Sequence, residues 1–373
     1  MKVLVVGGGV LGCANALEFA SRGHEVTLVE KRTLGGGASG AGTGLLMQRD
    51  AQVFHSQFRE FYVRSVREYY PKWMQKLQSY GGPVSLKTEG FWLGYTKPEK
   101  EQSFLDQCQR ERSKAYAKCL EIPDFLPEEM TLEFPLYHFP EESYLVNGDL
   151  LESLQLAMQR EGVQVFEGVE GFQLQENAEA TWKTGTWQGD QVLCCAGVWS
   201  AELLKPLGYD IPLVPVKGQV ALLKEKLWDK GVLQINDHFY LLPRGEHTLV
   251  GATSEARDWT ENFTEAGDEF LKGYLKQIFP TKEFSFARTW AGLRPRTKDR
   301  KPFMGWLESG KLALCCGHYK NGLSMAPLVA ECMANLLEGK EAPIDYSDFT
   351  PFRKKGVKRS SVLPETQSKI PRD

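Results

Sequence analysis

The chain has 373 residues, of which 42% are apolar and 25% are charged, and its formal net charge is −3. This is the composition of a globular protein with room for two or three domains, and it excludes a disordered chain, a collagen-like repeat and a disulfide-stapled miniprotein. The small net charge gives no global field for nucleic acid, and no apolar run approaches the roughly 18 residues of a membrane span.

The cysteine pattern indicates the cellular compartment, and the histidine spacing bears on metal binding. Eight cysteines show no C-x-x-C spacing, and the adjacent pairs 194–195 and 315–316 lie in apolar runs, which is typical of reduced, buried thiols in a cytosol. Residues 2–6 already have the pattern of a core strand, so we expect no signal peptide and a cytoplasmic protein. The six histidines have no ligand spacing, so no metal site is predicted.

A nucleotide-binding pattern opens the chain. The apolar run 2–6 is typical of a parallel strand buried on both faces, and Gly7, Gly9 and Gly12 complete the spacing G-x-G-x-x-G directly after it. Gly7 permits the tight turn, Gly9 lets a pyrophosphate approach the backbone, and Gly12 lets the following helix pack closely. That helix is predicted to stop at Gly23.

The next segment favours FAD over other dinucleotides. A second strand at 26–29 ends in Glu30, whose carboxylate suits the 2′-OH of an adenosine ribose and disfavours NADP. A glycine-rich loop follows at 35–44, in which Ser39 and Thr43 add hydroxyl donors. A second cradle of small residues suits a long ligand such as FAD, although the same composition is also typical of a flexible linker.

Segments far apart in the chain complete this domain. Core strands are predicted at 163–167, 191–196 and 311–316, and a helix with one apolar face follows from 323 and stops at Gly339. The last two strands run into small residues, as strands do where their carboxyl ends meet a cofactor.

Two insertions and a tail remain. Residues 46–145 look largely helical and aromatic-rich around 58–70, whereas 205–300 look β-rich, with strands expected at 214–223, 232–242, 248–252 and 284–291. The tail 353–373 is polar and basic, either a solvated, frayed end or a contact for an anionic partner. We predict an α/β fold with a Rossmann-like FAD-binding domain built from 1–45, 146–204 and 301–352, and an α+β substrate domain with an antiparallel sheet built from 46–145 and 205–300.

Three stretches make the chain similar to a known family. They are the fingerprint with its Gly-Ala-Ser-Gly-Ala loop, the run 290–295 (Trp-Ala-Gly-Leu-Arg-Pro), and the run 317–322 (Gly-His-Tyr-Lys-Asn-Gly). Two shorter runs, 237–244 and 196–200, fit as well. From residue 1 to about 352, in colinear order, the chain resembles the D-amino acid oxidase-like FAD-dependent oxidoreductases, and among them the bacterial glycine oxidases. The resemblance implies a FAD-binding domain of the GR2 type.

The resemblance also implies how FAD is held. The run 318–324 would wrap the pyrimidine edge of the flavin, with a helix N-terminus aimed at it, and a backbone contact to adenine would fall near 169–171. Related sarcosine oxidases attach FAD through a cysteine, and the matching position here is Gly292, so non-covalent FAD is implied. The cofactor-binding residues expected from the fingerprint and the resemblance are Gly7, Gly9, Val10, Leu11, Gly12, Glu30, Lys31, Ala38, Ser39, Thr43, Gly44, Leu45, Gly171, Ala196, Gly197, His318, Tyr319, Lys320, Asn321, Gly322, Leu323 and Ser324.

By the same resemblance, Arg294 holds a substrate carboxylate and Tyr240 hydrogen-bonds it, and a fork-shaped guanidinium suits that task. Alternatively, Arg294 belongs to a series of alternating cations, up to Arg300, that lines a solvated edge of the protein. The alternative for Tyr240 is a purely structural role in core packing. Lys320 stands where glycine oxidases have a second arginine, which implies a looser carboxylate grip or an ammonium that favours superoxide formation. His238 either tunes the pocket or is structural.

The implied reaction is oxidation of a small amino acid or N-substituted glycine by hydride transfer to flavin N5. It yields an imine and then an oxo acid, and O2 or another acceptor reoxidises the flavin, with O2 giving H2O2. A second hypothesis is a FAD-dependent tRNA wobble-uridine carboxymethylaminomethyl oxidoreductase, with phosphate contacts from the basic run 294–301 and the tail; the net charge of −3 argues against it. A third is a non-enzymatic flavin-binding protein. A homo-oligomer is possible.

Overall fold

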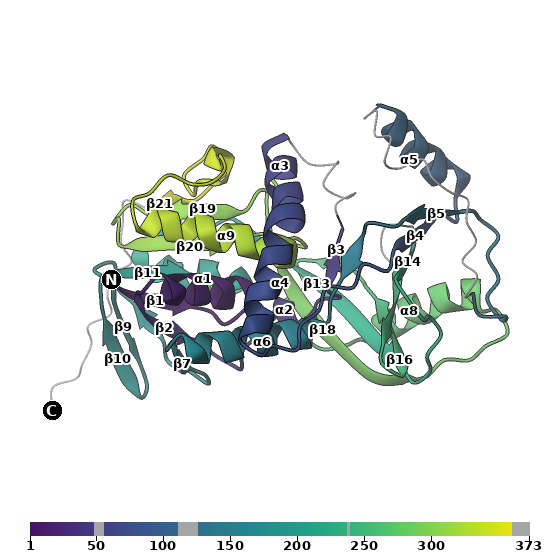
Figure 1. Ribbon diagram of the computed structural model, residues 1–373, viewed down its shortest axis with the longest axis horizontal. Helices are drawn as coiled ribbons and strands as arrows, with labels where there is room; N and C mark the ends of the chain where they lie inside the picture. The colour runs from purple at the N-terminus through teal and green to yellow at the C-terminus, as the bar shows by residue number, and fades with distance from the viewer. Residues whose placement is uncertain (48–55, 111–125, 237–238, 360–373) are drawn as a thin grey trace.

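Two β-sheets lie side by side in the computed structural model, which describes residues 1–47, 56–110, 126–236 and 239–359 (Figure 1). One sheet is built from the N-terminal strands together with strands from the middle and the C-terminal part of the chain. The other holds most of the chain from 213 to 297. This mixed α/β arrangement, with a parallel nucleotide-binding sheet and a largely antiparallel second sheet, confirms the predicted fold class.

The first sheet is the parallel one. Its central strand β1 alternates between two cores, because Val3 and Val5 pack in the cluster on one face while Leu4 and Val6 pack in the cluster on the other. Burial on both faces is the reason that the strand is apolar without interruption. The strand order is β19 (Phe303–Trp306), β20 (Leu312–Cys316), β11 (Gln191–Cys194), β1 (Lys2–Val6), β2 (Glu25–Val29) and β7 (Gln164–Phe166), with β19 antiparallel and the other pairs parallel.

Helices cover one face of this sheet and a small antiparallel sheet covers the other. The predicted first helix is α1; it ends at Ser21, two residues before the expected stop at Gly23, whose φ is +85°. The predicted strand 163–167 is present as β7, but the prediction that it lies in the core is wrong. It is the edge strand of the sheet, and two of its residues are exposed. The covering elements are α1 (Val10–Ser21), α6 (Asn147–Arg160) and α9 (Gly322–Leu337) on one face, and α7 (Ser200–Leu204) with β8 (Gln173–Leu174), β9 (Glu179–Trp182) and β10 (Gly185–Gln188) on the other.

The second sheet carries one long antiparallel pair that later positions the site. Strand β18 pairs with β13 along its whole length, with Arg294 opposite Val216. Helix α8 (Glu265–Ile278) packs on one face of this sheet. The order is β17 (Glu255–Ala256), β13 (Leu213–Leu223), β16 (His247–Gly251), β15 (Phe239–Arg244), β14 (Val232–Ile235), β4 (Phe91–Gly94) and β5 (Leu136–Phe139), with β18 (Phe286–Thr297) added on β13.

Several sequence expectations for this half need correction. The expected strand 232–242 is two strands, since β14 ends at 235 and β15 begins at 239. The insertion 46–145 is not helical throughout, because β4 and β5 extend the second sheet. Helix α8 was not predicted, although Thr264 precedes it and caps it by accepting a bond from the Gly267 amide.

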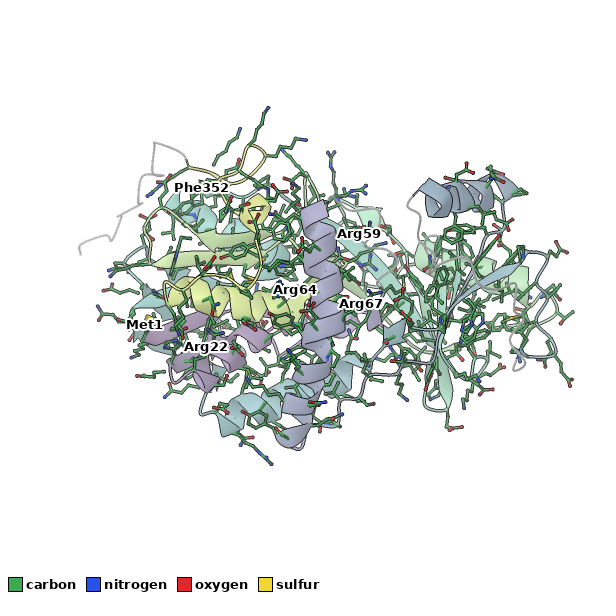
Figure 2. The ribbon with its side chains drawn as sticks, turned by 45° about the horizontal axis from the view of Figure 1, so that its top comes forward. Met1, Arg22, Arg59, Arg64, Arg67 and Phe352 are labelled. Atoms are coloured by element: carbon green, nitrogen blue, oxygen red, sulfur yellow. The ribbon has the colours of Figure 1, made fainter. Side chains whose placement is uncertain are left out.

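A long helical rod crosses the helical face of the first sheet (Figures 1 and 2). It consists of α3 (Ser56–Arg64), a π-helical turn η2 (Ser65–Tyr69) and α4 (Tyr70–Ser79), which confirms helix in the aromatic-rich stretch. Arg59, Arg64 and Arg67 follow along it in Figure 2, and Arg64 Nη1 donates to the carbonyl of Pro343 at 2.9 Å. Because this rod packs in the core of the nucleotide-binding half, we propose to assign it there and to keep the remaining domain division as predicted.

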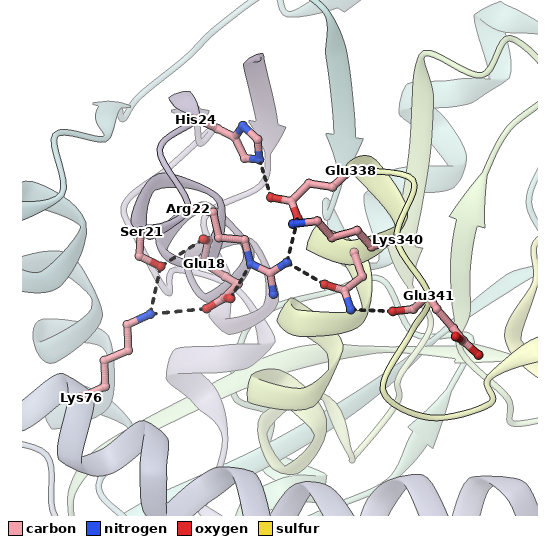
Figure 3. Close-up of polar contacts among 9 residues, drawn as sticks. Glu18, Ser21, Arg22, His24, Lys76, Glu338, Lys340 and Glu341 are labelled. Atoms are coloured by element: carbon pink, nitrogen blue, oxygen red, sulfur yellow. Dashed lines mark hydrogen bonds and ion pairs between the residues drawn. The ribbon is translucent and has the colours of Figure 1, made fainter.

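Charged side chains tie α1, α9 and α4 together at one edge (Figure 3). Arg22 donates to Glu18 at 2.8 Å and to Glu338 at 3.1 Å, and His24 lies 3.0 Å from Glu338. Lys340 pairs with the same carboxylate at 2.7 Å. This cluster holds the pKa of Glu338 down at about 2, with Lys340 as the largest cause.

The first part of the tail is docked rather than frayed, so that expectation is wrong for residues 353–359. Arg353 makes a two-pronged contact with Asp299, at 2.8 and 2.9 Å, and its guanidinium lies 4.2 Å from the ring centroid of Phe303. Arg359 pairs with Glu308 and Glu176. Residues 360–373 lie outside the described chain. The remaining elements are α2 (Ala38–Ala41), β3 (Leu45–Leu46), α5 (Pro98–Arg110), β6 (Ser143–Tyr144), η3 (Gly197–Trp199), η4 (Lys205–Leu207), β12 (Tyr209–Asp210), η5 (Ser347–Phe349) and β21 (Lys358–Arg359).

Candidate active site

A cavity of about 1110 Å³ has walls from both sheets. It is larger than most small-molecule pockets, which range over roughly 300–1,000 Å³, and so has room for an extended ligand and a small second molecule. Within the described ranges, no cluster of three or more His, Cys, Asp or Glu side chains that suits a metal ion is found. None of the described helices is both long and apolar enough to cross a membrane.

The glycine-rich turn between β1 and α1 forms one wall. Gly7 has φ +107°, and a Cβ on it would lie 2.6 Å from the carbonyl oxygen of Cys195. A Cβ on Gly12 would collide with the carbonyl oxygen of Gly7, so α1 approaches this turn as closely as glycine alone permits. The first amides of α1 therefore face the cavity at the positive end of the helix dipole.

Glu30 and Ser39 complete this wall. The Glu30 carboxylate accepts bonds from the amides of Gly8, at 2.7 Å, and Arg32, at 2.8 Å, which fixes it at the end of β2. The hydroxyl oxygen of Ser39 accepts the amide of Val10 at 2.9 Å, which leaves the hydroxyl proton available as a donor. The predicted second loop thus packs directly on the first.

Two residues that sequence reasoning missed hold the second loop. Asn147, at the start of α6, donates from Nδ2 to the carbonyl of Ser39 at 2.6 Å. Arg244 donates to the carbonyls of Thr43, at 2.7 Å, and Leu145, at 3.3 Å. The Ser39 carbonyl lies 108 positions from Asn147, and the Thr43 and Leu145 carbonyls lie 201 and 99 positions from Arg244, so no local pattern marks these contacts.

A third missed contact joins the two halves across the cavity. Arg32 Nη1 lies 3.0 Å from Glu261, and its guanidinium stands 5.0 Å from the ring centroid of Trp199. All three residues line the cavity beside Glu30. Charge complementarity therefore brings the segment after β17 against the loop after β2.

The run 318–324 lies where β20 passes into α9. His318 is 2% exposed, neither ring nitrogen has a partner among the described residues, and burial lowers its pKa to about 3. Asn321 is the N-cap of α9, and the first amides of that helix face the cavity. The start of the helix is held by the rod, because Tyr62 donates to the hydroxyl of Ser324 at 3.0 Å.

These features fit a dinucleotide with a polar ring system. Two helix N-termini and a glycine cradle face the same cavity, as anionic groups require. The Oδ1 atom of Asn147 and both ring nitrogens of His318 are buried without partners in the described chain, and all border the cavity. Buried polar atoms are normally hydrogen-bonded, so these atoms indicate a polar ligand such as FAD.

Arg294 and Tyr240 come together at the second sheet. The guanidinium of Arg294 lies on Gly218, where any Cβ would collide with it, and its Nη1 donates to the carbonyl of Thr253 at 3.2 Å. Tyr240 reaches the cavity because β15 alternates: its neighbours Phe239 and Leu241 pack toward α8. Burial lowers the pKa of Arg294, which nevertheless stays charged.

The structure places most of the expected site residues in the wall of this cavity. Lys298 and Arg300 are exposed, so a solvated edge describes them and not Arg294. Gly12 packs against the turn and does not line the cavity. His238 lies outside the described residues. The expected residues that line the cavity are Gly7, Gly9, Val10, Leu11, Glu30, Lys31, Ala38, Ser39, Thr43, Gly44, Leu45, Gly171, Ala196, Gly197, Tyr240, Arg294, His318, Tyr319, Lys320, Asn321, Gly322, Leu323 and Ser324.

Comparison with known proteins identifies the family of this chain. A glycine oxidase from Pseudomonas aeruginosa is 31% identical over 94% of this chain and 98% of its own length. A bifunctional protein ThiO/ThiG from a Nostoc species is 31% identical over 97% of this chain, which spans only 56% of that relative. The crystal structure of glycine oxidase from Geobacillus kaustophilus superimposes with a TM-score of 0.86 at 25% identity, covering 95% of this chain and 100% of the other. The sequence profile of the FAD-dependent oxidoreductases called DAO matches residues 2–336, and the chain belongs to this family.

Proposed function

We propose that this protein is an amino acid oxidase of the glycine oxidase type. It oxidises a small amino acid or N-substituted glycine to an imine, which water converts to an oxo acid, with O2 as the final acceptor and H2O2 as its product. Support comes from family membership, from the similarity to glycine oxidases along almost their whole length, and from the cavity itself. The exact substrate within this class is part of the proposal.

One observation carries the substrate class: a guanidinium lines the same cavity as the glycine turn. Arg294 is fixed by Gly218 and by the carbonyl of Thr253, and Tyr240 borders the same space. A fixed guanidinium binds a planar carboxylate through two charge-assisted bonds, which orients as well as holds it. A carboxylate-bearing amine is therefore the substrate that this wall fits.

The chain's own residues would divide the work as follows. Bound FAD supplies the chemistry, since it accepts the hydrogen and the electron pair from the carbon next to the nitrogen. Arg294 and Tyr240 orient the carboxylate so that this carbon faces the ring system. The N-terminal amides of α9, which face the cavity, would hold the ring system of FAD and would stabilise negative charge on it.

Non-covalent binding of FAD is part of the same proposal. Gly292 packs against Ala41, where a Cβ on it would lie 2.6 Å from the Ala41 Cβ, so a cysteine does not fit there. Among the described residues that line the cavity, the cysteine that could attach FAD is Cys195. Burial and the neighbouring Cys315 raise the pKa of its thiol well above the usual value. A thiol of that kind is a poor nucleophile.

The tRNA-modifying alternative is weakened at three of the cations that it invokes. Lys301 pairs with Asp348 at 2.5 Å, and Arg353 and Arg359 are engaged in ion pairs. Cations already paired within the protein are weak candidates for phosphate contacts.

The test is an anaerobic panel of glycine, sarcosine and D-alanine, with flavin absorbance as the readout. We expect at least one of these amines to bleach the flavin, and H2O2 to appear once air is admitted. A yellow protein that none of them reduces would contradict the proposal. Colourless protein that takes up no FAD on reconstitution would contradict the cofactor as well.

A further inference from the structure

Tyr319 occupies an unusual place in the cavity wall. Its backbone has φ +55°, a left-handed conformation that few residues other than glycine adopt, and its amide donates to the carbonyl of Pro295 at 3.0 Å. The preceding His318 forms an isolated antiparallel bridge with Arg296. These contacts fasten the loop after β20 to β18 and bring the phenol of Tyr319 into the cavity that Arg294 also lines.

Cations surround this phenol. The Arg296 guanidinium lies 6.0 Å and the Lys320 ammonium 5.7 Å from its ring centroid, and Arg294 is close enough to interact electrostatically. The Glu255 carboxylate interacts electrostatically with Arg294 rather than with this phenol, and its Oε1 accepts bonds from Gln219 and Thr253. Tyr240 is the second phenol near Arg294.

The phenol also has a route to solvent. The side chain of Ser254, which comes from the turn between β16 and β17 in the other half of the molecule, is close enough to the Tyr319 hydroxyl to help lower its pKa. Ser254 is exposed. A hydroxyl can accept one proton while it donates another, so Ser254 connects the phenol inside the cavity with water outside.

The charge around Tyr319 changes its proton affinity. Burial alone raises the pKa of a phenol, but Lys320, Arg294 and Arg296, together with the side chain of Ser254, outweigh burial and hold the pKa of Tyr319 below its usual value. The neighbouring His318 is a poor proton acceptor at neutral pH, because burial lowers its pKa to about 3.

An amine oxidase of the proposed type needs such a proton acceptor. Amino acids reach the enzyme as ammonium ions, and the nitrogen must lose a proton before its lone pair can assist removal of hydrogen from the adjacent carbon. Resting on the proposed function, we propose that Tyr319 is a catalytic residue that takes this proton from the substrate ammonium and passes it to solvent through Ser254.

The step balances without a further reactant. The substrate N–H bond breaks and its electron pair stays on nitrogen, while the proton bonds to the hydroxyl oxygen of Tyr319. The proton that this hydroxyl carried passes through the Ser254 hydroxyl to water, so that Tyr319 ends the step as it began. No electron is transferred, so oxidation of the carbon remains a separate step.

The decisive variant is Tyr319→Phe, because it removes the hydroxyl and keeps the ring. At neutral pH we expect kcat with glycine to fall about 100-fold, the low end of the range for general acid–base catalysis, and to recover at high pH, where the substrate carries a free amine. The rising limb of the pH profile should move to higher pH. Ser254→Ala should give a weaker shift in the same direction, and acetate, a carboxylate without an amine, should bind the variant as it binds the wild type.

A second readout is independent of turnover. In an ultraviolet titration of the FAD-loaded protein, one tyrosine of the wild type should ionise before the others and be missing in Tyr319→Phe. Tyr209→Phe is the matched control, since Tyr209 does not line the cavity, bonds Glu176, and has its pKa raised to about 12, mainly by burial. It should leave both the early ionisation and the pH profile unchanged.

The outcomes separate the two proposals. If the wild type oxidises glycine and Tyr319→Phe keeps the wild-type pH profile, the proton role of Tyr319 is wrong and the proposed function stands. An early tyrosine that persists in Tyr319→Phe overturns the assignment in the same way. If the wild type oxidises no amine of the panel, the proposed function fails and the proton role falls with it.

Discussion

Replacing Arg294 by alanine tests the substrate site most sharply. The guanidinium lies on Gly218 and already donates one bond to the carbonyl of Thr253, so its position does not depend on the substrate. The substitution removes the charge and the fork together, while the residues proposed to contact FAD remain. We therefore expect FAD to stay bound and the substrate to bind poorly.

The magnitude follows from the bonds that are lost. Two charge-assisted hydrogen bonds to a carboxylate contribute about 1.5–3 kcal/mol each, or roughly 3–6 kcal/mol together. Since about 1.4 kcal/mol corresponds to a tenfold change, KM should rise by roughly 10²–10⁴-fold. Arg294→Lys keeps the charge without the fork, so its KM should lie between those of the wild type and Arg294→Ala.

The assay is steady-state oxidation of the best amine in the panel, with flavin absorbance recorded for each preparation. Arg288→Ala is the matched control, because Arg288 is an exposed arginine on the same strand, and it should leave KM unchanged. A KM for Arg294→Ala within about twofold of the wild type, at equal FAD content, would refute the assignment of Arg294 to the carboxylate.

Three further predictions concern cofactor binding and stability. Gly12→Ala places a methyl group against the carbonyl of Gly7, so purified protein should carry much less FAD and melt at a lower temperature; full flavin occupancy would contradict the close approach. Arg353→Ala leaves Asp299 without its two-pronged partner, and unfolding in urea should show a loss of about 2–3 kcal/mol; an unchanged midpoint would mean that the docked tail adds nothing. The pKa of Glu338 is lowered from 4.5 to about 2, so its carboxylate stabilises the fold above pH 4.5 and this contribution is lost as the pH falls toward 2. Glu338→Gln should therefore reduce Tm near neutral pH and flatten the decrease of Tm between about pH 4.5 and 2; a parallel acid limb in both proteins would contradict this.

The nucleotide-binding half could be predicted because its determinants are local. Gly7, Gly12 and Glu30 follow one another within a single β-α-β unit, and each has a steric or hydrogen-bonding task that its residue type reveals. The parallel strands were recognisable from continuous apolar runs. Family resemblance then extended the expected site to Arg294 and Tyr240, beyond what spacing alone indicates.

The rest depends on contacts between distant parts of the chain. Asn147 and Arg244 act on carbonyl groups of the second glycine-rich loop, and any residue type can present a carbonyl. Arg353 looked like part of a solvated tail because its partner Asp299 lies 54 positions away. Helix α8 did carry a local signal, in the Thr264 cap and the apolar spacing of its buried face, which the β-rich interpretation of the surrounding segment obscured.

One cavity is proposed to hold both FAD, along the first β-α-β unit, and a carboxylate, on Arg294. A crystal structure of the protein with FAD and acetate, a carboxylate that it cannot oxidise, tests this directly. We expect the pyrophosphate at the Gly7–Gly12 turn, the ring edge at the start of α9, and the acetate oxygens on the Arg294 guanidinium beside Tyr240. FAD bound elsewhere, or acetate bound away from Arg294, would contradict the account.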